Sequence, residues 1–126
     1  MKVDIAGTRS QPERRAILRL IRDVARAERC SAPELSIVLV SNPQIRRLNR
    51  LFLGRNRATD VMAFPISDRL LGEIYVSRDQ ARVQAQRYKV TCREELLRLV
   101  LHGFLHLLGD GHRQMKPKYG RYLGGC

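Results

Sequence analysis

The chain has 126 residues, a length that suits one domain with its own hydrophobic core. Its 24 Lys and Arg residues outnumber its 12 Asp and Glu residues, which gives a formal net charge of +12. No run approaches the roughly 20 apolar residues of a membrane span, so the composition argues against a membrane protein, whereas the positive charge favours a polyanionic partner, most commonly nucleic acid.

Strand and helix patterns alternate along the chain, and capping residues mark the helix starts. Ser10 with Glu13, and Thr91 with Glu94, have the spacing of a capping box. The expected elements, in order, are a strand over 1–5, a helix over 10–29, a strand over 34–41, a helix over 42–52, two strands over 59–66 and 71–77 that form a hairpin, and helices over 77–89 and 91–109. This order predicts a small α/β fold of the mixed α+β kind, with a mixed β-sheet of about four strands packed by helices. We assign residues 1–112 to this domain and 113–126 to a basic, glycine-containing tail that we expect to be partly disordered.

A row of arginines lies opposite the apolar face of the helix over 10–29. It steps by four, three, four and three residues through Arg15, Arg19, Arg22, Arg26 and Arg29. Such a row is either a solvated helix face or a surface that follows phosphates. If it binds RNA, Arg19, Arg22 and Arg26 are the central contacts. A compositional bias of the source genome would explain the arginines without any partner.

The cysteines and the N-terminal stretch bear on the compartment. Cys30, Cys92 and Cys126 are odd in number and widely spaced, which predicts reduced thiols and no disulfide framework. The stretch MKVDIAGTRS has no apolar segment of the kind found in secretion signals. We therefore expect a cytoplasmic protein.

All three histidines fall within residues 102–112, at the end of an almost wholly apolar helix. His102 and His106 are four residues apart and therefore share one helix face. Gly109 permits a sharp turn, after which His112 can return toward the same place. Three imidazoles around an open fourth position form the ligand set of a catalytic zinc site. The sequence therefore predicts one metal ion, zinc or another transition metal, at the end of the central apolar helix.

The histidine cluster also allows two different interpretations. The three residues could be ordinary hydrogen-bonded side chains, although an unpartnered imidazole in an apolar helix costs about 1–3 kcal/mol. The spacing also matches the zinc proteases that have the motif H-E-x-x-H-x-x-G-x-x-H. Those enzymes need Glu as a base where this chain has Gly103, so the sequence offers a metal site without the protease's base.

The segment VLHGFLHLLGDGH resembles the H-G-x-L-H-L-x-G-Y-D-H motif of the YbeY family. Upstream, LNRLFLGRNRATDVMAFP is similar to the family's L-N-x-x-[YF]-R-G-K-D-x-x-T-D-V-L-S-F-P, and LGEIYVS resembles its G-[DE]-I-x-I-S strand. The resemblance extends from Ile37 to His112 and implies a metal-dependent endoribonuclease that cleaves single-stranded RNA. It also implies that His102, His106 and His112 hold the metal. The resemblance further implies that the protein acts in maturation of the 3′ end of small-subunit rRNA and in removal of defective ribosomes, with the small ribosomal subunit as partner.

Three departures from the family motifs bear on activity. Leu53 stands where the family has a loop arginine, so nearby arginines must contact phosphate instead. We take Arg50, Arg55 and Arg57 as RNA contacts and Arg55 as the catalytic cation. Asp110 lies one residue farther from the last histidine than the family's aspartate, and we take it as a catalytic carboxylate beside the metal. The family's acidic helix after the motif is replaced by the basic tail.

The expected chemistry is metal-assisted hydrolysis of a phosphodiester. The metal would lower the pKa of its bound water, and arginines would hold flanking phosphates. The general base stays open among Asp60, Glu73 and Asp110, although an Asp at a strand start often bonds nearby backbone instead. Two other function classes also stay open. One is a ribosome-assembly or RNA-binding factor with a structural metal, and the other is a zinc-dependent peptide hydrolase, against which Gly103 and the positive charge both argue.

Overall fold

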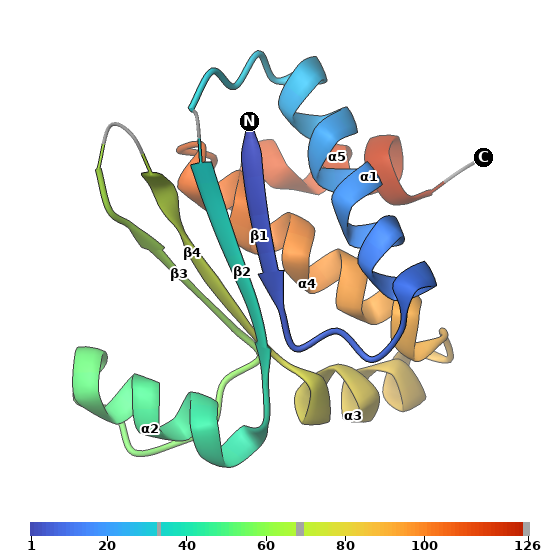
Figure 1. Cartoon of the computed structure of the whole chain (residues 1–126). Helices are drawn as coiled ribbons and strands as arrows, with labels where there is room; N and C mark the ends of the chain where they lie inside the picture. The colour runs from blue at the N-terminus through green and yellow to red at the C-terminus, as the bar shows by residue number, and fades with distance from the viewer. Residues whose placement is uncertain (33, 68–69, 125–126) are drawn as a thin grey trace.

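The computed structural model describes residues 1–32, 34–67 and 70–124 (Figure 1). Its elements are β1 (Lys2–Ala6), α1 (Gln11–Ala27), β2 (Glu34–Val40), α2 (Asn42–Leu53), β3 (Val61–Pro65), β4 (Leu70–Ser77), α3 (Arg78–Tyr88), α4 (Cys92–Leu107) and α5 (His112–Leu123). Up to α4, every boundary lies within two residues of the one that the sequence predicts. The caps explain this agreement, because the side chains of Ser10, Ser41, Ser77 and Thr91 each accept a hydrogen bond from the backbone N–H three residues later.

One four-stranded mixed sheet has the strand order β1-β2-β4-β3. β2 pairs parallel with β1 on one side and with β4 on the other, whereas β3 pairs antiparallel with β4, which confirms the predicted strand pair. Residues 68 and 69, in the predicted hairpin turn, lie outside the described residues. β3 is an edge strand, so it has a neighbouring strand of this sheet on one side only.

The main hydrophobic core lies between one face of the sheet and a helical layer that contains α1 and α4. Side chains alternate along each strand, and those at Leu35, Ile37, Ile74 and Val76 point into this core. α4 is the central helix, because it contacts α1, α3, α5 and the strands β3 and β4. Its side chains from Leu96 to Leu105 are mostly buried, as its apolar sequence predicts.

A smaller cluster packs on the opposite face of the sheet. Val40, Ile45 and Met62 are its buried members, and Ile45 belongs to α2. α2 therefore lies across the sheet from α1 and α4, as Figure 1 shows. This arrangement places the loop after α2 beside the edge strand β3.

The C-terminal segment differs from the prediction. Residues 112–123 form the helix α5, where we expected a partly disordered tail, and residues 125–126 lie outside the described residues. Met115 is buried, and Tyr119, Tyr122 and Leu123 pack against the main core. The helix forms because these side chains recur at helical spacing, even though Pro117 lies within it. None of the described helices is both long and apolar enough to cross a membrane.

Candidate active site

A tight turn after α4 brings the last histidine back toward the first. Gly109 adopts a left-handed φ of 95°, and the N–H of Asp110 donates to the carbonyl of Leu105 at 3.0 Å. α5 then begins at His112, and the ring centroids of His102 and His112 lie 6.1 Å apart. The turn at Gly109 thus returns His112 toward His102, as the sequence predicts.

A cavity of about 390 Å³ joins the end of α4 to the loop after α2, and we call it the histidine cavity. His102, Gly103 and His106 line it from α4, and Arg55 and Arg57 line it from the loop. The rest of the wall comes from the start of the edge strand β3 and from α2, including Asn49, Leu53, Val61, Met62 and Phe64. Two groups of residues predicted separately from the sequence therefore meet in one space.

Asn49 fixes the loop that supplies the arginines. Its side chain is 2 % exposed, and its Nδ2 donates to the carbonyl of Arg57 at 3.0 Å. α2 ends at Gly54, whose φ of 69° is left-handed, and the N–H of Arg55 donates to the carbonyl of Asn49 at 3.3 Å. These bonds fold the loop back along α2, so that its arginines reach the edge of the sheet.

Gly103 has a packing reason to be glycine. A Cβ at this position would lie 2.7 Å from Cγ2 of Ile74 and 3.3 Å from Cγ2 of Val61. Any side chain here would push α4 away from the sheet. A glutamate base of the protease kind has no space at position 103, which removes the chemistry on which the peptide-hydrolase alternative depends.

Tyr119 orients His102. Its Oη lies 2.6 Å from Nδ1 of His102, and the two rings stack with 9° between their planes. The Tyr119 hydroxyl also lies 3.7 Å from Sδ of Met115. Because Tyr119 engages Nδ1 of His102, Nε2 is the ring nitrogen that a metal would use.

The electrostatic surroundings keep His102 neutral. Burial lowers the pKa of His102, Asp60 opposes that effect, and the charges of His112, Arg98 and His106 lower the pKa further. His102 is therefore uncharged at neutral pH, which is the form that binds metals.

The three histidines converge only in part. His102 is half-buried and His106 is exposed within the cavity, whereas His112 does not line it. Among the described residues, no group of three or more His, Cys, Asp or Glu side chains lies close enough together to hold a metal ion. The donor chemistry fits zinc, since imidazole is a common zinc ligand and, among the described residues, no hydrogen bond engages Nε2 of His102. A three-histidine site requires the exposed rings to rotate toward that atom.

The carboxylates named from the sequence have other partners. Asp110 accepts from Nζ of Lys118 at 2.7 Å and does not line the cavity, so the structure gives no support to its predicted catalytic role. Asp60 accepts from the N–H of Val61 at 2.8 Å, which is the backbone bond expected at a strand start. Glu73 accepts from the hydroxyl of Tyr75 at 2.8 Å.

Tyr119 and Asn49 were not singled out from the sequence. The periodic apolar side chains after residue 112 would have revealed the helix that bears Tyr119, but Pro117 and the glycines concealed it. Asn49 is a polar residue in an apolar position of α2, and that contrast marks a buried side chain that must bond something.

The predicted RNA contacts lie in different places. Arg50 is exposed on α2, and Arg55 and Arg57 line the histidine cavity. The α1 row of Arg19, Arg22 and Arg26 is exposed and does not line that cavity.

Comparisons with known proteins point to one family. A family model described as "Endoribonuclease YbeY" matches residues 3–119. The chain is 36% identical over 123 residues to the protein of that name from Chlorobium phaeovibrioides, a match that covers 91% of this chain and 82% of the relative. It is 44% identical over 85 residues to the one from Sulfurihydrogenibium sp., covering 63% of this chain and 56% of the relative.

A solved structure shows the same architecture. The solution structure of TM1509 from Thermotoga maritima matches with a TM-score of 0.73 and 29% identity, over 96% of this chain and 86% of that one. The matched segments span 56% and 60% of the relatives from Sulfurihydrogenibium and Persephonella marina, so this chain corresponds to somewhat more than half of those proteins. The family model covers nearly the whole of this chain, and the chain therefore belongs to the YbeY family.

Proposed function

We propose that this protein is a metal-dependent endoribonuclease that cleaves single-stranded RNA. In this proposal it acts in the cytoplasm on the 3′ end of small-subunit rRNA and in the quality control of ribosomes, with the small ribosomal subunit as partner. We infer the activity from the family to which the chain belongs. We assign the residues that would carry it from the histidine cavity and its surroundings.

The histidine cavity is the observation that supports the proposal most. Imidazoles from α4 and guanidinium groups from the α2 loop line the same space at the edge of the sheet. Hydrolysis of a phosphodiester needs such a pairing, because a water must be activated while negative charge on the phosphate is offset.

Each side chain has a role in the proposed reaction. His102, His106 and His112 would hold a divalent transition metal such as zinc, which when bound lowers the pKa of a water and polarises the scissile phosphate. Arg55 binds the scissile phosphate and offsets its developing charge, and Arg57 binds the neighbouring phosphate. Asp110 has no part in this mechanism, because its carboxylate is paired with Lys118.

A second candidate function is RNA binding in ribosome assembly without cleavage. It is favoured by Leu53, an exposed apolar side chain on the cavity wall where the family has a cation. It is also favoured by the incomplete convergence of the three histidines.

One experiment separates the two functions. The protein, loaded with zinc or manganese, is incubated with a single-stranded RNA and with a duplex of the same sequence, beside the variant His106→Ala. We expect cleavage of the single strand alone and none by the variant. If the wild-type protein binds the single strand but never cleaves it with either metal, the assembly function replaces the nuclease. Cleavage by His106→Ala at the wild-type rate would exclude the histidine cavity as the active site.

A further inference from the structure

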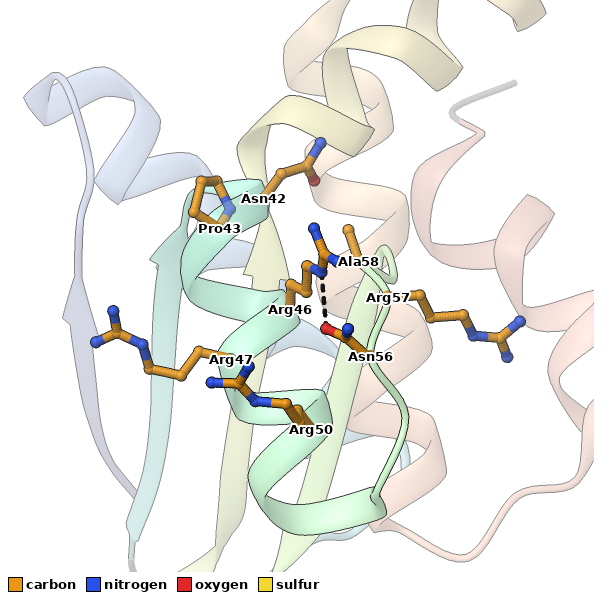
Figure 2. Close-up of a pocket in the computed structure, with 8 residues that line it drawn as sticks. All are labelled: Asn42, Pro43, Arg46, Arg47, Arg50, Asn56, Arg57 and Ala58. Carbon is orange, nitrogen blue, oxygen red and sulfur yellow. Dashed lines mark hydrogen bonds between the residues drawn. The ribbon is translucent and has the colours of Figure 1, made fainter.

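A second and larger cavity, of about 690 Å³, lies against α2 and the loop after it, and we call it the arginine cavity. Arg46, Arg47 and Arg50 line it from the helix, and Arg57 lines it from the loop. Figure 2 shows Arg47 and Arg50 extending from one side of α2, while Arg57 extends the other way. The remaining wall, which includes Asn42 and Asn56, is neutral.

The positive charge of this cavity has no protein counterpart. Four of its eight lining residues are arginines and none is acidic. Among the described residues, no carboxylate forms an ion pair with Arg46, Arg47, Arg50 or Arg57. On α2, Arg50 stands four residues after Arg46 and three after Arg47, so the like charges are neighbours and repel one another. An anion bound among them would remove that repulsion.

Two hydrogen bonds join α2 to the loop that forms the other side of the arginine cavity. Nε of Arg46 donates to Oδ1 of Asn56 at 2.9 Å, as Figure 2 shows, and the other N–H groups of Arg46 can still bind a ligand. The buried side chain of Asn49 ties the helix to the carbonyl of Arg57. Helix and loop are thus joined at two points, which fixes the Arg46 side chain and the backbone of Arg57.

Arg57 connects the two cavities, because it lines both. We propose that the arginine cavity binds a backbone phosphodiester of the same RNA strand whose scissile linkage lies in the histidine cavity. This inference rests on the proposed function. The lining has no aromatic ring on which a base would stack, so the site recognises phosphate and not base identity. Arginine suits this purpose because its planar group binds phosphate oxygens in pairs.

Two other anions share this chemistry, namely free phosphate and an acidic peptide. The continuity through Arg57 favours the strand, since an extended polyanion can fill both cavities at once, whereas a single phosphate ion fills neither. A strand already bound at one cavity has lost its translational and rotational freedom, so contact with the second cavity adds affinity without that entropic cost again.

The test measures binding and not cleavage. A 2′-O-methylated single-stranded RNA of about 12 nucleotides is titrated at several salt concentrations in the presence of a chelator, so that metal-dependent cleavage does not occur. The triple variant Arg46→Gln/Arg47→Gln/Arg50→Gln is compared with Arg19→Gln/Arg22→Gln/Arg26→Gln on α1, which loses the same charge. All six side chains are exposed and glutamine is a good helix former, so both variants should fold, and circular dichroism checks this.

We expect the α2 variant to flatten the dependence of log affinity on log salt by about 0.7, because that is the contribution of one phosphate contact to a single strand. The α1 variant should change it far less. An α2 variant that binds no differently from the α1 variant would overturn the proposal. Inorganic phosphate and polyglutamate serve as competitors, and either one displacing RNA at equal charge concentration would overturn the assignment to a nucleic acid strand. Failure of the proposed nuclease would appear separately, as binding that depends on α2 without cleavage of unmodified RNA.

Discussion

Helices α1 and α2 both present arginines to solvent, but those of α2 line the arginine cavity whereas Arg19, Arg22 and Arg26 of α1 line neither of the two cavities described above. Arg46 and Arg50 of α2 share the arginine cavity with a loop arginine, and that loop reaches the histidines. Similar spacing on two helices therefore leads to different surroundings.

The difference lies in how the chain continues after each helix. α1 packs its apolar face on the core, and Arg19, Arg22 and Arg26 are exposed on its other side. The loop after α2 turns at Gly54 and is fastened to Asn49, so it closes a concave wall beside the helix. In these two helices, the row of like charges lines a described cavity where the following loop folds back along the helix.

The largest expected effect tests whether the functional centre lies beside α2. Purified protein should contain about one transition metal per chain, and His106→Ala should contain almost none, since the imidazoles supply most of the affinity. Elemental analysis measures both. The α1 variant Arg19→Gln/Arg22→Gln/Arg26→Gln should keep its metal. Wild-type protein that takes up no zinc at micromolar concentration would contradict the metal site.

The next effect concerns the loop cation. Arg55→Ala should lower single-turnover cleavage about a hundredfold or more, because a guanidinium aimed at developing charge contributes a few kcal/mol. Arg22→Ala on α1 is the matched control and should leave the rate within a few fold. Leu53→Arg, at an exposed position on the cavity wall, should keep or raise the rate. Equal rates for Arg55→Ala and the control would mean that the loop after α2 contributes no more to catalysis than α1 does.

A smaller effect concerns the tyrosine behind the histidine cavity. Tyr119→Phe removes the hydroxyl that is hydrogen-bonded to Nδ1 of His102, so metal affinity should fall about 10- to 100-fold. Competition with a chelating dye measures this affinity without any RNA. The NMR shift of Nδ1 of His102 should change with the loss of this hydrogen bond, which a merely structural role for the hydroxyl would not produce.

The smallest effect concerns the end of α1. Glu28 joins α1 to α5, because it accepts hydrogen bonds from Lys118 and Tyr122. The bond from Lys118 is the largest cause that lowers the pKa of Glu28, and the bond from Tyr122 is the next. A lowered folded-state pKa stabilises the protein above the ordinary value of 4.5, and this contribution is lost as pH falls below it. Glu28→Gln should therefore lower the Tm by a few degrees at pH 7 and less at pH 3. A constant difference across this range would mean that Glu28 stabilises through packing alone.

The sequence predicted the helices and strands up to α4 well, because their signals are local. Capping residues define where a helix starts, and apolar periodicity defines which face is buried. The pairing of His102 with His106 on one helix face follows from the same periodicity. α5 was missed because Pro117 and Gly120 weaken the local pattern, whereas contacts with the core stabilise this helix.

The sequence by itself determined the family, the mixed α/β fold and the histidines that would bind a metal, since all three depend on residue identity and short spacing. The tertiary structure alone decided which arginines meet the histidines, that Asp110 bonds Lys118, and that Tyr119 bonds His102. It also decided that the arginines of α2 and its loop form a cavity while those of α1 do not. These outcomes depend on contacts between segments far apart in the chain, and no local pattern encodes the distance between two such segments.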